Sequence, residues 1–501
     1  MSKTSEEFQK YLDKMAQYEH VTTLLYWDMR TGTPEKGQEG HTRALTHFSM
    51  ESFKAEKDPR VEEMLRILSQ PEELDALKPE LQFTVKKMAE NLEKRKRIPE
   101  DFYESFVEEQ ALSEAAWEKA KRTNDYSIFA PHLKKMIEMT ARMTGYTDPG
   151  KEVYNVLLDN YEKGMDIDTI DRLFEDMKRE LVPLVKKIVS APQPDDSKFR
   201  KMYPKMEQKA ACDMLLEYIG FDKAAGTTAE SEHPFTLNFN QDDVRITNHF
   251  MEDNALCAIY SVIHEGGHGI FEQNVNPDYD QTYAAGCCYM GIHESQSRFY
   301  ENVLGRNRNF WVPIYDKLCE LIPEYKEITL DEFYKEVNHV RNSMIRTEAD
   351  EVTYCFHIIL RYEIEKAIFR DHVSVDDLPQ MWSDKMEEYL GIRPANDAEG
   401  ILQDMHWSDG SFGYFPSYLL GSIYDGMFLD TIERELGSVD EILARGEIKK
   451  ITRWLNQKIH QYGSIRETKE VIAKVCGKEV SAEPLIRYFK EKYTEVYALN
   501  D

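Results

Sequence analysis

Residues 166–190 read DIDTIDRLFEDMKRELVPLVKKIVS, and their apolar side chains recur at every third or fourth position from Ile170 to Ile188. This spacing places the apolar side chains along one side of an α-helix. Asp166 stands just before the pattern, where its carboxylate can accept the free N–H groups of a first helical turn. We therefore expect a helix that begins after Asp166, with Pro183 inside it as a cause of bending.

The same periodicity recurs along most of the chain, which predicts a mainly α fold. The segments that show it are residues 73–96, 100–121, 127–144, 256–272, 288–304, 331–372 and 467–496. No repeat of solenoid length is visible among them, so a stacked array of identical helical units is not expected.

Residues 233–250 break the helical pattern, because apolar and polar side chains alternate there around a turn-like Asn240-Gln241-Asp242. This alternation predicts a small antiparallel ribbon. Segments rich in Gly, Pro and Asn predict loops. They are residues 191–196, 220–233 and 274–286.

The composition is that of a globular protein: 41% of the 501 residues are hydrophobic and 31% are charged. Lys and Arg total 63 against 91 Asp and Glu, which leaves a formal charge of −28. Such a charge repels polyanions, so nucleic acid is not an expected partner.

No stretch has the apolar length of a membrane-spanning helix, and residues 1–20 lack the apolar core of a signal peptide. We therefore expect a cytoplasmic protein with no membrane partner. The cysteines form no CxxC motif, which favours reduced thiols in small apolar positions. They are Cys212, Cys257, Cys287, Cys288, Cys319, Cys355 and Cys476.

The pentapeptide His264-Glu265-Gly266-Gly267-His268 lies in a predicted helix. Its two histidines are about one turn apart, so both imidazoles can reach one zinc ion with Glu265 between them. Gly266, Gly267 and Gly269 are poor helix formers, which indicates that a facing helix or a substrate backbone packs closely against this turn. The alternative is two histidines that only pack in a core.

A catalytic zinc ion takes a third protein ligand and keeps one open position. The next predicted helix offers His293-Glu294. Adjacent helical residues differ in direction by about 100°, so only one of this pair can face the metal. The residues alone leave the choice open.

Several blocks around these histidines resemble, in the same order, the M32 family of zinc carboxypeptidases. The blocks are His233–Phe235, Asp243–Thr247, His264–His268, His293–Gln296, Ile345–Asp350 and Gly400–Trp407. Leu25–Asp28 is also similar to that family, so the resemblance covers the whole chain.

The resemblance implies that His264, His268 and Glu294 hold one Zn²⁺ ion per chain. It implies release of single amino acids from peptides with a free C-terminal carboxylate, with broad side-chain tolerance. It also implies a two-lobed helical fold with a deep groove, a small sheet beside the metal, and a homodimer. Co²⁺ and Mn²⁺ are possible substitutes, because they bind the same ligand types.

The reaction needs a general base and a donor for the oxyanion. Glu265 is the predicted base, since a carboxylate beside a metal-bound water can accept its proton. His406 and Tyr418 are the predicted oxyanion donors, with Tyr414 as an alternative. Gly410 and Gly413 suggest a loop that flexes over the substrate.

Recognition of a free C-terminus favours an arginine, whose planar fork matches a carboxylate. Arg346 is the first candidate, in a predicted long helix where pairing with Glu348 or Asp350 is the alternative. Arg245 could also bind substrate, although pairing with Asp243 in the ribbon is favoured.

Other polar residues have supporting roles in this hypothesis. His293 is free to donate a hydrogen bond to substrate if Glu294 binds the metal. Asp404 and Asp350 are candidates to orient a metal-bound imidazole. The edge of the ribbon could pair with an extended peptide as an added strand.

We expect one peptidase unit over residues 1–501. Within it we expect a helical lobe over 1–230 that covers the groove, a zinc-site and substrate-binding region over 231–430, and C-terminal helices over 431–501. A zinc endopeptidase or oligopeptidase would use Glu265 in the same way without a carboxylate clamp. A noncatalytic helical binding scaffold is the second alternative, although structural zinc normally takes four protein ligands.

Overall fold

The computed structural model describes residues 2–286 and 289–499. Over these ranges the fold is mainly α, as the sequence predicts, and it contains one three-stranded sheet. Cys287 and Cys288 lie outside the described residues; the other five cysteines are free thiols. None of the described helices combines the length and the apolar character needed to cross a membrane.

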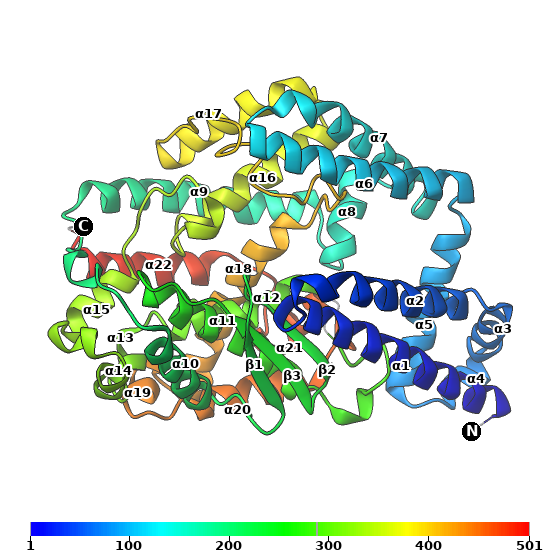
Figure 1. Ribbon diagram of the computed structural model, residues 1–501, viewed down its shortest axis with the longest axis horizontal. Helices are drawn as coiled ribbons and strands as arrows, with labels where there is room; N and C mark the ends of the chain where they lie inside the picture. The colour runs from blue at the N-terminus through cyan, green and yellow to red at the C-terminus, as the bar shows by residue number, and fades with distance from the viewer. Residues whose placement is uncertain (1, 287–288, 500–501) are drawn as a thin grey trace.

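Helices from the first half of the chain surround the centre of the molecule (Figure 1). They are α1 (Lys3–Thr31), α2 (Gln38–Glu56), α3 (Pro59–Leu68), α4 (Pro71–Asp75), α5 (Pro79–Lys96), α6 (Glu100–Thr123), α7 (Ala130–Thr147), α8 (Val153–Tyr161), α9 (Ile167–Ser190) and α10 (Lys205–Ile219). Helix α9 begins as predicted: the Asp166 carboxylate accepts the N–H of Thr169 at 2.8 Å.

The second half of the chain supplies the central helices and the C-terminal layer (Figure 1). They are α11 (Ala255–Gln273), α12 (Met290–Arg298), α13 (Arg308–Trp311), α14 (Tyr315–Leu321), α15 (Leu330–Val337), α16 (Tyr354–Phe369), α17 (Leu378–Leu390), α18 (Phe415–Leu436), α19 (Val439–Ala444), α20 (Lys449–Lys458), α21 (Thr468–Cys476) and α22 (Glu483–Val496). A π-helical segment, η5 (Phe299–Leu304), continues α12.

Two apolar cores stabilise the fold. The smaller core joins α1, α3 and α5 through side chains such as Phe8, Leu68 and Val85. The larger core runs through the rest of the molecule and includes both α11 and α18. The lobe boundaries near residues 230 and 430 remain predictions.

Three predicted helical segments, 73–96, 331–372 and 467–496, are each interrupted. Residues 76–78 separate α4 from α5. Residues 338–353 separate α15 from α16, and there the Asp350 carboxylate accepts backbone N–H groups of Arg341, Val352 and Thr353. Such bonds from a side chain to the backbone replace those of a helix. Near the C-terminus, Gly477 ends α21 with a φ of +72°, and α22 follows with Pro484 in its first turn.

The sheet has the strand order β1-β3-β2. Strands β2 (Thr236–Asn240) and β3 (Asp243–Asn248) form the predicted antiparallel pair. Strand β1 (Gly226–Glu230) pairs with β3 in parallel, so the sheet is mixed. The loop prediction for 220–233 was wrong here, because GTTAE lacks the apolar alternation that signals a strand.

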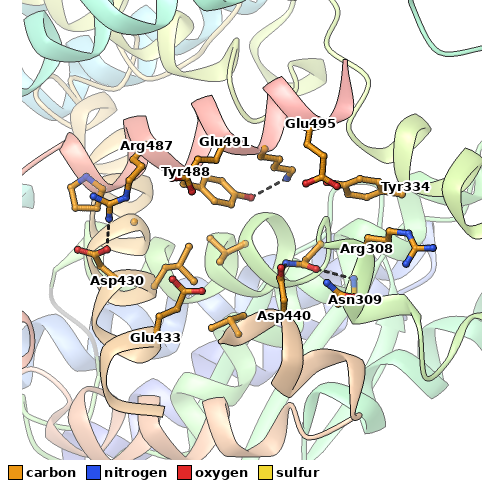
Figure 2. Close-up of a pocket in the computed structure, with 17 residues that line it drawn as sticks. Arg308, Asn309, Tyr334, Asp430, Glu433, Asp440, Arg487, Tyr488, Glu491 and Glu495 are labelled. Carbon is orange, nitrogen blue, oxygen red and sulfur yellow. Dashed lines mark hydrogen bonds and ion pairs between the residues drawn. The ribbon is translucent and has the colours of Figure 1, made fainter. Parts of the chain in front are cut away.

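A polar pocket of about 270 Å³ lies between α18 and α22. In Figure 2, Arg487 of α22 points toward Asp430 of α18, and Glu433 lies beside this pair. The described residues that line this pocket include none of the site residues predicted from the sequence.

Candidate metal centre

The two histidines of α11 and Glu294 of α12 come together at the centre of the molecule. Their ligand atoms all lie within 4.8 Å of one another. The Glu294 carboxylate oxygen Oε2 is 3.9 Å from His264 Nε2 and 3.6 Å from His268 Nε2. Two imidazole nitrogens and one carboxylate oxygen form a donor set that suits a divalent zinc-like ion.

The charge state of these residues also suits a cation. Burial raises the pKa of Glu294, but its hydrogen bond with His268 and the charges of His264 and Arg298 lower it to about 2. Burial lowers the pKa of His264, but Glu301 and Glu294 outweigh burial and raise the pKa to about 9. The negative charges of Glu301 and Glu294 stabilise the proton on His264, and they would attract a metal ion in place of that proton.

Gly267 explains how α11 and α12 approach closely enough to share this centre. A Cβ atom at Gly267 would lie 2.6 Å from the carbonyl oxygen of Gln296 and 2.7 Å from Cα of Ser297. The helix that faces the glycine-rich turn is therefore α12, the helix that carries Glu294. This close approach confirms the prediction that a facing helix packs on the turn.

Glu265 is buried beside the two histidines. Its carboxylate accepts a hydrogen bond of 2.6 Å from the hydroxyl of Thr236, on strand β2. Burial raises the pKa of Glu265, whereas His264 and the Thr236 hydroxyl act in the opposite direction. Strand β2, through the hydroxyl of Thr236, therefore holds one carboxylate oxygen of Glu265, the predicted base.

Glu301 orients His264, a role that sequence reasoning missed. Glu301 Oε2 lies 2.8 Å from His264 Nδ1, and Arg306 pairs with the other carboxylate oxygen at 3.3 Å. Asp350 and Asp404, the predicted candidates for this role, bind elsewhere. The spacing could have found Glu301, because it follows Glu294 by seven residues, about two helical turns.

His293 lies on the other side of the same centre. Its ring stacks on that of His268 with centroids 4.4 Å apart, and its Nε2 is 2.8 Å from the Glu272 carboxylate. Asn238 of β2 donates to the other oxygen of Glu272 at 2.7 Å. His293 is thus close to the three ligand residues but bound to Glu272.

The predicted oxyanion donors lie together at the start of α18. His406 Nε2 is 3.4 Å from the Tyr418 hydroxyl, and the His406 ring stacks on Tyr414 at 5.4 Å. Burial lowers the pKa of His406 to about 4, so its ring is neutral at pH 7. One turn after Tyr418, a Cβ atom at Gly421 would lie 3.3 Å from Cγ of Glu294. The helix that carries Tyr418 therefore packs against Glu294, one of the three predicted ligands.

Hydrogen bonds hold the loop before α18 in this structure, and its movement over bound substrate stays a prediction. The Glu365 carboxylate accepts the indole N–H of Trp407 at 2.7 Å and the N–H of Gly413 at 2.9 Å. A Cβ atom at Gly413 would lie 2.6 Å from the carbonyl carbon of Leu157. Gly413 therefore permits close packing against α8.

Arg346 lies in a short 3₁₀ turn, and its predicted helical position was wrong. It pairs with Asp404, with Nε and Nη2 both 2.9 Å from Oδ1, and it donates to the Tyr354 hydroxyl at 3.0 Å. Its guanidinium also lies 5.2 Å from the ring centre of Tyr418. Arg361 also pairs with Asp404. The acidic partner of Arg346 is therefore Asp404, not Glu348 or Asp350, the partners that the alternative interpretation named.

Arg245 makes the structural pair that its sequence position favours. Its Nε and Nη2 each lie 2.8 Å from the Asp243 carboxylate, and its guanidinium stacks over Phe239 at 4.4 Å. A separate pocket of about 360 Å³ lies nearby, between α1, β2 and the end of α11.

A helical fold that brings two histidines and a glutamate together beside a buried carboxylate is typical of a metallopeptidase. A family model described as Carboxypeptidase Taq (M32) metallopeptidase matches residues 7–493. The chain therefore belongs to the M32 family of metallopeptidases, whose members use a metal ion.

Curated relatives match the chain over its length. It is 40% identical to Carboxypeptidase 1 of Bacillus subtilis over an alignment of 496 residues, and this alignment covers 99% of each chain. It is 34% identical over 502 residues to Thermostable carboxypeptidase 1 of Thermus thermophilus, which covers 98% of each.

Solved structures have the same fold. The M32 carboxypeptidase from Deinococcus radiodurans R1 matches with a TM-score of 0.95 at 28% identity, over 99% of this chain and 100% of that chain. The carboxypeptidase of Pyrococcus furiosus matches with a TM-score of 0.92 at 33% identity, over 98% of this chain and 99% of that chain.

Proposed function

We propose that this protein is a zinc-dependent carboxypeptidase that releases single amino acids from peptides with a free C-terminal carboxylate. His264, His268 and Glu294 hold one zinc ion, and a broad range of C-terminal side chains is accepted. The observation that carries the proposal is the meeting of these three donors beside the buried carboxylate of Glu265. When bound, zinc lowers the pKa of a water molecule to about 7 and polarises the scissile carbonyl.

Glu265 moves the proton in this reaction. Its carboxylate accepts a proton from the attacking water and passes it to the leaving amine. Burial supports this role, because a raised pKa makes the Glu265 carboxylate a stronger proton acceptor at neutral pH. Thr236 holds one of the two carboxylate oxygens and so orients the other.

Tyr418 and His406 stabilise the oxyanion. The Tyr418 hydroxyl donates to the developing negative charge, and His406 lies 3.4 Å from this hydroxyl, where it can orient it. Tyr414 is the alternative donor, since its ring packs 5.0 Å from that of Tyr418.

Arg346 binds the substrate carboxylate in this proposal. This role is supported by the position of the Arg346 guanidinium over the ring of Tyr418, one of the proposed oxyanion donors. Asp404 holds the guanidinium in place, and N–H groups remain to bind a second carboxylate. Arg245 is the alternative clamp, and His293 is a further donor to substrate.

We also propose that the protein acts in the cytoplasm as a homodimer.

Mass spectrometry of the products tests this proposal. Zinc-loaded protein is incubated with one peptide as its free acid and as its C-terminal amide. We expect a ladder that shortens from the free C-terminus and little cleavage of the amide. Internal cuts, or equal cleavage of the amide, would instead indicate an endopeptidase. No cleavage by protein that holds its metal would favour a binding scaffold.

A further inference from the structure

A buried carboxylate lies at the start of the helix that carries Glu294. Glu162 ends α8, and its side chain is almost completely enclosed. One oxygen of Glu162 accepts the backbone N–H of Gly291, in the first turn of α12. The other oxygen accepts the hydroxyls of Thr468 at 3.0 Å and Tyr424 at 3.3 Å. A single carboxylate thus joins α8, α12, α18 and α21.

The start of α12 is built to receive this carboxylate. The N–H groups of a first helical turn have no partner inside the helix, so they bind an oxygen acceptor placed before it. A Cβ atom at Gly291 would lie 2.6 Å from Glu162 Oε1, so a larger residue would displace the carboxylate. Glu294 follows Gly291 by three residues, within one turn.

The other contacts of α12 restrain its sides and its far end. Gly267 of α11 and Gly421 of α18 each bring a neighbouring backbone against α12. Beyond Glu294, Gln296 is bonded to His460 at 2.8 Å and Arg298 donates to Ser422 at 2.7 Å. The contact between Glu162 and Gly291 restrains the first turn of α12. The helix is therefore held both before and after Glu294.

The position of α12 along its own axis matters for the metal centre. A slide by one residue would move Glu294 by about 1.5 Å and turn it by about 100°. Such a shift is large compared with the separations of 3.6 Å and 3.9 Å between the Glu294 carboxylate and the two imidazoles.

We propose that Glu162 is a positioning residue that fixes the start of α12 so that Glu294 faces His264 and His268. The inference rests on the proposed function, because it concerns the affinity of these residues for zinc. Glu162 acts through Glu294 and does not contact the metal itself.

Zinc affinity tests this inference directly. We expect Glu162→Ala to raise the zinc dissociation constant about 10- to 100-fold, the usual effect of residues that orient metal ligands. Glu162→Gln keeps an oxygen to accept the Gly291 N–H and should retain most of the affinity. Gly291→Ala should weaken zinc binding as Glu162→Ala does, because its methyl group displaces the carboxylate. Competition with a chromogenic chelator measures each dissociation constant.

Glu365 provides a matched control. It is fully enclosed and accepts three hydrogen bonds, from Tyr154, Trp407 and Gly413, but these partners lie on α8 and on the loop before α18. Glu365→Ala should therefore destabilise the metal-free protein in urea while its zinc dissociation constant stays within about twofold of the wild type.

The outcomes separate the inference from the proposed function. The inference is overturned if Glu162→Ala and Gly291→Ala bind zinc as tightly as the wild type, or lose no more affinity than Glu365→Ala. Should Glu162→Ala fail to fold, Glu162→Gln and Gly291→Ala decide the question. A wild-type protein that holds no zinc would overturn the proposed function and this inference together.

Discussion

Thr236 donates a 2.6 Å hydrogen bond to the carboxylate of Glu265, which connects the edge strand β2 to the helix that carries both histidines. The Thr236 hydroxyl lies 3.0 Å from the backbone carbonyl oxygen of Glu265 as well. The sheet is small, but it reaches the residue with the largest chemical role in the proposed reaction. Its contribution is to hold a carboxylate that would otherwise rotate about its side-chain bonds.

Glu265→Gln should abolish most of the turnover and leave the zinc content unchanged. The amide cannot accept a proton, and general-base catalysis contributes at least about a hundredfold. Peptide hydrolysis under saturating substrate gives kcat, and elemental analysis gives the metal content. An active Glu265→Gln enzyme would refute the assignment of the base.

Thr236→Val should lower kcat by about tenfold with little change in KM, because a hydrogen bond to a charged group contributes about 1.5–3 kcal/mol. Valine keeps the shape of threonine and its preference for a strand. Thr227→Val on strand β1 is the control, since it removes an exposed hydroxyl from the strand at the other edge of the sheet. Equal kcat values for all three proteins would show that the Thr236 hydroxyl does not orient Glu265.

Glu301→Ala should weaken zinc binding about 10- to 100-fold, because it removes the partner that orients the His264 ring. Glu301→Gln keeps an oxygen acceptor and should bind zinc more tightly than Glu301→Ala does. The same chelator competition measures both variants. Wild-type affinity in Glu301→Ala would mean that the packing of α11 alone orients His264.

Arg346→Lys should raise KM for free-acid peptides about 10- to 100-fold, because lysine lacks the planar fork that binds a carboxylate through two parallel bonds. Asp404 keeps its second partner, Arg361, so the surrounding loop should stay in place. Arg245→Lys is the comparison. If it raises KM for the free acid more than Arg346→Lys does, Arg245 is the clamp.

Glu365 should make stability depend on pH. Burial raises the pKa of Glu365 from 4.5 to about 7 in the folded protein, against hydrogen bonds from Trp407, Gly413 and Tyr154 that lower it. The folded state therefore binds this proton more tightly than the unfolded state. The resulting stability is complete below the unfolded pKa and is lost as the pH rises through the folded pKa.

Urea unfolding of the wild type and Glu365→Gln across this range measures the effect. Relative to the variant, the wild type should lose about 3 kcal/mol between pH 4.5 and about 7, at roughly 1.4 kcal/mol per pKa unit. Stabilities that stay parallel across the range would show that Glu365 ionises normally in the folded protein.

Structural features that depend on residues close together in the sequence could be predicted from local patterns. Helix α9, its Asp166 cap and the antiparallel pair β2–β3 follow from spacing alone. The two histidines and Glu294 also come together as the motifs indicate, although their roles remain predictions.

The errors concern contacts that hydrophobic periodicity does not encode. Arg346 is held by Asp404, 58 residues away, and this pairing leaves no periodic signal in the sequence. The break before α16 depends on several backbone bonds to Asp350, and strand β1 depends on a parallel partner. Glu301 lies in the π-helical segment after α12, and its contact with His264 joins two separate elements, so the apolar periodicity of the sequence does not mark it.

The separate small core of α1, α3 and α5 gives these three helices apolar contacts of their own. It includes side chains such as Leu68 and Val85, and none of the three predicted metal ligands belongs to it. Regions with their own contacts can open with their own free energy. We therefore expect the amide hydrogens of α3 to exchange with solvent at a rate different from those of α11, so that denaturing stress exposes these helices before it separates His264, His268 and Glu294.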